Sequence, residues 1–324
     1  MTHLTYKQAQ SNPCHNCRAG CCTYLPLKDV QITNIMELDH LYYLLHFEGI
    51  EILLVDGYTW RVHYNAKCNY LTENNLCSIH NSPQKPKICT SYNPYHCFYK
   101  PAFLHEESPQ YVRFNLARFV FFREQMQFDS DRNITSIPNI TEIRHLLPPF
   151  KEKPPQIEST PVVPEILKNN ISNQQAQNPC SNCPSYCCTT LQFPIDTPTN
   201  ISNLDYLRFC TGFPNVFVTL HENQWSVNVK STCMNYNATT TPYHCDVFGK
   251  EERPLQCSLY NELTCSYKKR YISGQELPSF VLQHEHITIF EELCSFDSIG
   301  NITGFPDIYT LRNVIENTDS SHFL

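Results

Sequence analysis

The residues of this chain that are best suited to chemistry are its cysteines. The 324 residues include 18 of them, and four fall within nine positions, CHNCRAGCC, from Cys14 to Cys22. Thiols gathered in this way form disulfides, bind soft or borderline metal ions as thiolates, or take part in redox chemistry. The choice among these uses depends first on the compartment of the protein.

The sequence gives no sign of export or of membrane insertion. Its first residues, MTHLTYKQAQ, lack the apolar segment that a secretory signal requires. The longest apolar runs, such as IEILLV at 50–55, are too short to span a bilayer. We therefore expect a soluble cytoplasmic protein, in which clustered thiols more often bind a metal than form disulfides.

The cysteine cluster occurs twice in the chain. NPCHNCRAGCCTYL at 12–25 matches NPCSNCPSYCCTTL at 178–191, and the four later cysteines of the first copy also recur. Two extra cysteines of the second copy, Cys210 and Cys294, replace apolar residues and are expected to be small buried hydrophobes. The repeat predicts two homologous units, which we place at 10–150 and 177–320, joined by a Pro-, Asn- and Gln-rich linker at 151–176.

The number and type of the shared residues limit the metal sites that are possible. No histidine near the cysteines recurs in both units, so the comparison favours thiolate ligands alone. Eight thiols exceed the four that a tetrahedral zinc takes. Two four-thiolate sites per unit, one iron–sulfur cluster with four thiols left over, and one zinc with four spare thiols all stay open. Adjacent cysteines such as Cys21 and Cys22 need an unusual backbone to reach one ion, and can serve different ions.

The elements that must position these thiols are of mixed type. Apolar residues at helical spacing predict a helix over 33–49 with Thr33 or Asn34 as its N-cap. The β-rich stretch at 50–64 has Asp56-Gly57 at its centre, which predicts a hairpin.

The second unit repeats the same pattern. A helix is expected over 202–212, and a hairpin over 216–229 with its turn at Glu222-Asn223. Trp60 and Trp225 occupy matching places on the returning strands and are expected to anchor the core.

The later cysteines are predicted to lie in proline-containing loops. An apolar helix over 110–128 is expected to cover the site in the first unit. The predicted fold class is therefore α+β: two small cysteine-rich metal-binding domains, each with a helix, a β-hairpin, cysteine-bearing loops and a covering helix.

The full pattern, C-x2-C-x3-CC, then two separate cysteines, P-x-x-C-x-x-Y and a last cysteine, resembles a known family. This is the CxxCxxxCC or YkgJ-like cysteine-cluster family of zinc- or iron-chelating domains, to which flagellin lysine N-methylases are also similar. The resemblance covers nearly all of both units. It implies a metal-chelating module with these ligands: Cys14, Cys17, Cys21, Cys22, Cys68, Cys77, Cys89 and Cys97 in the first unit, and Cys180, Cys183, Cys187, Cys188, Cys233, Cys245, Cys257 and Cys265 in the second.

Two departures from that family pattern distinguish the units. The family often has Arg-Pro before the P-x-x-C cysteine, which the second unit keeps as Arg253-Pro254 and the first replaces with Lys85-Pro86. A histidine three residues after Cys77 has a phenylalanine in its place in the second unit. Any role of that histidine is therefore confined to the first unit.

Two classes of function follow from these features. One is a binding protein whose partners are metal ions, zinc or iron, the iron as ions or as an iron–sulfur cluster. The other is an enzyme, either a redox protein with an iron–sulfur centre or a methylase-like protein-modifying enzyme. The chain has only 8 glycines and no G-x-G, which argues against a nucleotide-type cofactor site. The net charge of −7 and the lack of a basic patch argue against nucleic acid, and the sequence leaves a protein partner and catalysis open.

Overall fold

The structure is a computed structural model, and it describes residues 19–57, 59–90, 111–150, 185–221, 224–237, 239, 245–259 and 279–318. Its architecture is mixed α+β, as the sequence predicts. For convenience, residues 19–150 are called the first half and residues 185–318 the second half. The linker at 151–176 lies outside the described residues.

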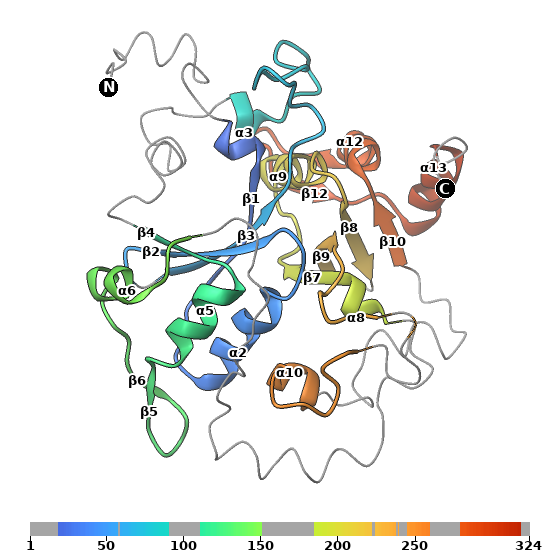
Figure 1. Cartoon of the computed structure of the whole chain (residues 1–324). Coiled ribbons are helices and arrows are strands. Elements are labelled where there is room, and N and C mark those ends of the chain that lie inside the picture. Colours follow the sequence, from blue (N-terminus) through green and yellow to red (C-terminus); the bar gives the residue numbers. More distant parts are fainter. Residues whose placement is uncertain are drawn as a thin grey trace, which may run out of the picture.

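The first half is built on an antiparallel sheet with strand order β1-β3-β2-β4 (Figure 1). Its strands are β1 (Tyr24–Val30), β2 (Ile50–Val55), β3 (Thr59–Asn65) and β4 (Tyr111–Phe114). A two-stranded ribbon pairs β5 (Gln127–Phe128) with β6 (Ile134–Ser136). The helices are the 3-10 turn η1 (Gly20–Cys22), α2 (Ile35–Leu44), α3 (Lys87–Thr90), α5 (Leu116–Arg123) and α6 (Ile140–Leu146).

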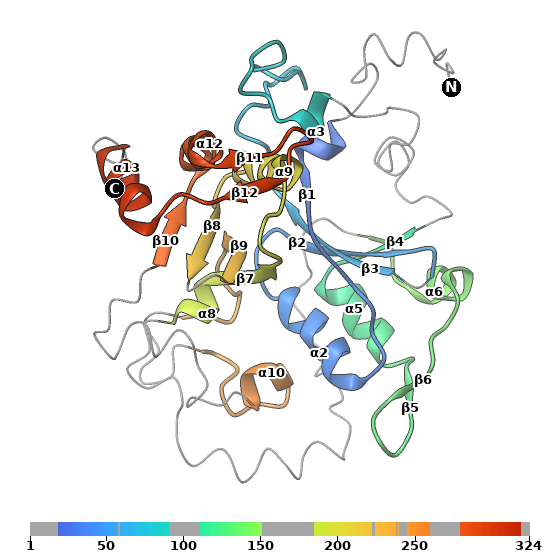
Figure 2. The same ribbon diagram turned by 180° about the vertical axis from the view of Figure 1, so that it is seen from behind.

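The second half has a sheet of the same order, β7-β9-β8-β10. Its strands are β7 (Thr190–Ile195), β8 (Val216–His221), β9 (Gln224–Lys230) and β10 (Ser279–Leu282), with a ribbon of β11 (Ser295–Phe296) and β12 (Ile302–Gly304). The helices are α8 (Tyr186–Thr189), α9 (Ile201–Thr211), α10 (Leu255–Ser258), α12 (His284–Leu293) and α13 (Ile308–Thr318). Seen from behind, the two sheets lie next to each other (Figure 2).

The first hairpin has the turn that its sequence predicts. Val55 pairs with Thr59, so Asp56-Gly57 lie at the start of a three-residue connection, and both have positive φ values, 52° and 81°. The strands that it joins, β2 and β3, pair in continuous register. The predicted turn of the second hairpin, Glu222-Asn223, lies outside the described residues.

The helix that follows β1 begins where the sequence places its cap. The Asn34 side chain accepts hydrogen bonds from the backbone amides of Met36 and Glu37, which satisfies two of the unpaired donors of the first turn. Asn200 does the same for α9 by accepting from the amide of Asn203. The predicted 33–49 helix is shorter than expected and ends at Leu44.

The expectation of one covering helix over 110–128 is wrong. The segment starts as strand β4, whose Val112 is paired with Leu54 of β2, and only then becomes α5. Asn115 accepts a hydrogen bond from the amide of Arg118 and so begins the helix after the strand. Two aromatic side chains of α5, Phe119 and Phe122, pack on Trp60, so α5 covers the core of the sheet.

Both tryptophans anchor the core, as predicted. Trp60 and Trp225 are 1% and 3% exposed, and Trp225 packs edge-on against Phe290 of α12. One continuous hydrophobic cluster contains buried residues of both halves, including Phe47 from the first and Phe213 from the second. The two halves therefore share apolar packing in the structure.

Removing the Trp60 side chain should destabilise the protein by about 3–5 kcal/mol, because a Trp→Ala change leaves a large cavity in a packed core. Urea unfolding followed by circular dichroism measures the difference in free energy of unfolding. Phe121→Ala is the control, since Phe121 is an aromatic residue of α5, the helix that packs on Trp60, but is itself 37% exposed. A loss at Trp60→Ala no larger than at Phe121→Ala would contradict its assignment as a core anchor.

Candidate metal centre

A turn with a left-handed residue positions the adjacent cysteines of each cluster. Ala19 has a φ of 58°, in the left-handed region that residues other than glycine rarely adopt, and the 3-10 turn η1 follows it. This backbone brings the Cys21 and Cys22 sulfurs to 3.9 Å from each other. Two thiolates on one tetrahedral zinc, with Zn–S bonds of about 2.3 Å, lie about 3.8 Å apart. The adjacent cysteines thus have a spacing that suits a single ion.

Three further thiols of the first half gather at this turn. The Cys68 amide donates to the Cys22 carbonyl at 2.7 Å, and Cys77 joins the same loop through a β-bridge to Leu71. Cys89 lies on α3. Burial first, and then the charges of the neighbouring thiols, raise the pKa of Cys89 to about 12. Cys89 therefore lies close enough to the other thiols for their charges to disfavour its ionisation.

The second half repeats this arrangement bond for bond. Ser185, with a φ of 59°, precedes α8 and its cysteines. The Cys233 amide donates to the Cys188 carbonyl at 2.8 Å, and Cys245 bridges to Tyr236. Cys257 lies on α10, as Cys89 lies on α3.

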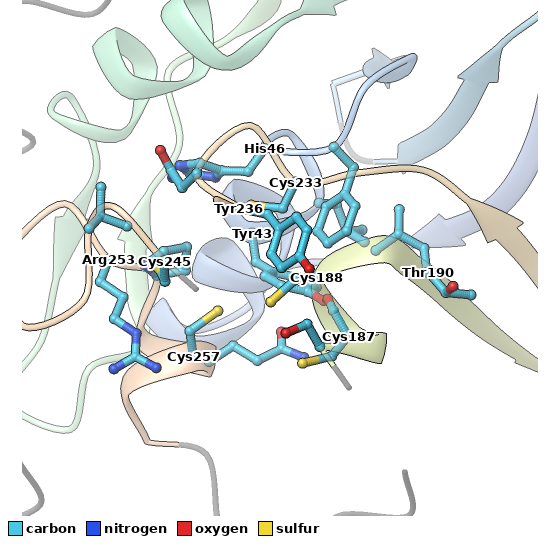
Figure 3. A pocket seen from close by; sticks show the side chains of 18 of the residues that line it. Tyr43, His46, Cys187, Cys188, Thr190, Cys233, Tyr236, Cys245, Arg253 and Cys257 are labelled. Atoms are coloured by element: carbon cyan, nitrogen blue, oxygen red, sulfur yellow. The ribbon is translucent and has the colours of Figure 1, made fainter. Parts of the chain in front are cut away.

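The described cluster cysteines of the second half line one cavity of about 190 Å³. Figure 3 shows Cys188 and Cys257 with their sulfurs turned toward one another in this cavity. A thiolate at Cys257 raises the pKa of Cys188, as does one at Cys233. The five cysteines of the cavity wall are Cys187, Cys188, Cys233, Cys245 and Cys257.

These groups fit a thiophilic metal by their chemistry. The described cysteines are all free thiols, and thiolates are the preferred ligands of zinc and of iron–sulfur clusters. As they are placed, no three Cys, His, Asp or Glu side chains within the described ranges converge closely enough to hold an ion. Six of the sixteen predicted ligands lie outside the described residues: Cys14, Cys17, Cys97, Cys180, Cys183 and Cys265.

The two cysteines of each adjacent pair have opposite pKa shifts. A hydrogen bond from the Cys22 thiol lowers the pKa of Cys21, and the same bond raises the pKa of Cys22. Cys187 and Cys188 show the same opposite shifts. Metal binding would replace the shared proton, because metal ligands must be deprotonated.

One cation faces the thiols in each half. The charge of Lys85 lowers the pKa of Cys21, and the charge of Arg253 lowers the pKa of Cys187. Positive charge beside a group of thiolates offsets their mutual repulsion. Arg253 also lines the cavity, and its buried Nε has no hydrogen-bond partner among the described residues.

The difference between His80 and Phe248 is explained by these cations. Lys85 Nζ lies 3.0 Å from His80 Nδ1, whereas the Arg253 guanidinium lies 4.3 Å from the centre of the Phe248 ring. A hydrogen bond orients the lysine, and a cation–π contact orients the arginine. The histidine that only the first half carries thus has a structural counterpart in the second.

Sequence reasoning missed the contribution of α2 to the second cluster. Tyr43, His46 and Phe47, all from the first half, line the cavity of the second-half thiols. Burial lowers the pKa of His46 to about 4, so its ring is neutral, and its Nδ1 donates to the Tyr42 carbonyl at 2.9 Å. Comparing the repeats treats each unit alone. One sequence feature does indicate that α2 has a polar contact on its buried side: Asp39 lies inside an otherwise apolar helical stretch.

The two extra cysteines of the second half lie outside the cluster. Cys210 and Cys294 are 0% and 9% exposed and belong to the hydrophobic core, which confirms their prediction as buried hydrophobes. They make useful controls, because they are the same residue type in another environment.

No family model matches this chain, and searches of curated proteins and of solved structures also found no match. Within the described part of the chain, no helix has the length and apolar character needed to cross a membrane.

In the metal-free protein, Lys85→Met should slow the alkylation of Cys21 by iodoacetamide several-fold at neutral pH. The ammonium charge lowers the pKa of Cys21, so its loss raises that pKa and leaves less thiolate to react. Peptide mass spectrometry over time gives the rate. Lys28→Met removes an equal charge from an exposed position on β1 and should leave the rate unchanged. Equal rates in the two variants would show that Lys85 does not act on the thiol.

Proposed function

We propose that this protein is a tandem cysteine-cluster protein that chelates zinc or iron, the iron as ions or as an iron–sulfur cluster, through eight thiolates in each repeat unit. The observation that carries the proposal is the cavity of the second half, whose wall contains all five of its described cluster cysteines. The first half supports the proposal, because it has the same kind of turn, the matching hydrogen bond from the Cys68 amide, and a matching short helix for its own thiols.

A metal would also account for how the loops are held. The two ends of each cluster are far apart in sequence, as in Cys21 and Cys89, with three strands and helix α2 between them. Ligands scattered along a chain gain stability when one ion ties them together, because the binding free energy then contributes to folding. The resemblance to zinc- or iron-chelating cysteine-cluster domains agrees with this use. We infer two structurally similar tandem domains, with metal sites formed by the matching thiols.

The second candidate is a redox enzyme built on an iron–sulfur centre. It is favoured by the surplus of thiols, because such a cluster needs four ligands and each repeat unit provides the eight shared cysteines. The hydrogen-bonded pair of Cys21 and Cys22, whose sulfurs lie 3.9 Å apart, is also suited to redox chemistry. A methylase remains the weaker form of this candidate, because the chain has no G-x-G for a nucleotide-type cofactor.

Anaerobically purified protein should contain at least two metal equivalents per chain by elemental analysis. Zinc would leave the protein colourless, whereas iron with sulfide would give a brown protein with visible absorption. Cys21→Ser/Cys22→Ser should remove about half of the metal, because it removes two ligands from one of two similar sites.

Cys210→Ala is the matched control, since it removes a thiol from the core and should leave the metal content unchanged. A metal content near zero, together with thiol titration that finds the cysteines oxidised in pairs, would contradict chelation. Iron that cycles between oxidation states in the purified protein would favour the redox candidate.

A further inference from the structure

The cysteine-bearing turns of the two halves are held by carboxylates from the opposite half. Asp205 on α9 accepts hydrogen bonds from the amides of Lys87 and Ile88, both at 2.8 Å, at the start of α3. Asp39 on α2 accepts from the amide of Gln256 at 3.0 Å, at the start of α10. Because α3 carries Cys89 and α10 carries Cys257, each carboxylate fixes the backbone beside a cluster thiol. Figure 1 and Figure 2 both show α3 next to α9, and α10 next to α2.

The residues that follow the same two helices contact the backbone beside a second cluster cysteine of the opposite half. The Met234 amide donates to the His46 carbonyl at 2.8 Å, and the Asn69 amide donates to the Gly212 carbonyl at 2.9 Å. These donors directly follow Cys233 and Cys68 in the sequence. A Cβ placed on Gly212 would lie 3.8 Å from the Cys68 sulfur, so this thiol lies near the end of α9.

A third contact exists for the second cluster alone. The Tyr43 hydroxyl donates to the Cys187 carbonyl at 2.8 Å. The matching position in the second half is Phe209, which has no hydroxyl to offer the first cluster. The structure therefore holds the second cluster at three cysteines and the first at two through residues of the other half.

Burial gives the two carboxylates their importance. Asp39 and Asp205 are 1% and 2% exposed. A buried charge is costly unless it is paired, and both have arginine partners: Arg123 at 3.6 Å from Asp39, and Arg208 in contact with Asp205. Hydrogen bonds from backbone amides to a carboxylate are stronger than neutral ones. Asp205, in contact with Arg208, thus fixes its turn by two charge-assisted bonds in a buried interface. Asp39 fixes the other turn by one bond; burial raises the pKa of Asp39, and the charge of Arg123 opposes that shift.

We propose that the two metal sites are composite, with each cluster of thiols positioned by a helix of the opposite half: Asp39 on α2 positions the second site, and Asp205 on α9 positions the first. This inference rests on the proposed metal binding. Asp39 and Asp205 are positioning residues, since they act on the metal through the backbone of the thiol-bearing turns. Residues outside the ligand shell that orient ligands change metal affinity by about 10–100-fold when they are removed.

The test uses Co²⁺ alone as the probe, in the full chain, with the visible absorption of cobalt thiolates as the readout. Cys21→Ser/Cys22→Ser leaves only the second site, and Cys187→Ser/Cys188→Ser leaves only the first. Asp39→Asn should weaken Co²⁺ binding by about 10–100-fold at the second site and should change it little at the first. Asp205→Asn should do the reverse. Asp29→Asn, which breaks an exposed ion pair with Arg61, should change neither site.

The crossed design separates positioning from a loss of folding, because general destabilisation would weaken both sites together. Tyr43→Phe provides a milder second variant, and it should weaken Co²⁺ binding at the second site only. Loss at the site of the same half, equal loss at both sites, or no loss in any variant would overturn the composite arrangement. Failure of the unsubstituted chain to bind Co²⁺ would instead refute the proposed metal binding itself, and the composite sites with it.

Discussion

The arrangement of the thiols depends on two buried carboxylates that the halves exchange. Loops and four-residue helices carry the cysteines, and such short elements are not stable alone. Asp39 and Asp205 fix these elements by accepting hydrogen bonds from their first backbone amides. The contacts are reciprocal, like those of a two-fold symmetric dimer, but within one chain. Each cluster therefore depends on a helix of the other half for the position of one of its short helices.

Electrostatics imposes the next constraint. Thiols packed together are hard to ionise, because burial and neighbouring thiolates both disfavour the charge. The structure counters this with a hydrogen bond inside each adjacent pair, which lowers the pKa of one thiol, and with a cation in each half, Lys85 or Arg253. A bound dication would complete the balance. The different side chains that orient these two cations, His80 and Phe248, show that the halves conserve the charge and not the means of holding it.

Local features of the fold could be predicted from the sequence. The Asp56-Gly57 turn, the Asn34 cap and the buried Trp60 all follow from local chemistry or from periodicity. Strand β4 was missed because an apolar stretch that runs into a helix reads as one helix, and only pairing with β2 makes its start a strand. The crossed contacts could not be predicted, because matching Asp39 to Asp205 shows a shared residue but not which half it faces.

Anomalous diffraction from crystals of the purified full chain, collected at the absorption edge of its metal, tests the central claim most directly. The account predicts a metal peak in each half, one among the thiols around Cys21 and Cys22 and one in the cavity around Cys188 and Cys257, with α9 and α2 respectively against them. Crystals with no anomalous peak at either cluster, or with disulfides joining these cysteines, would contradict it.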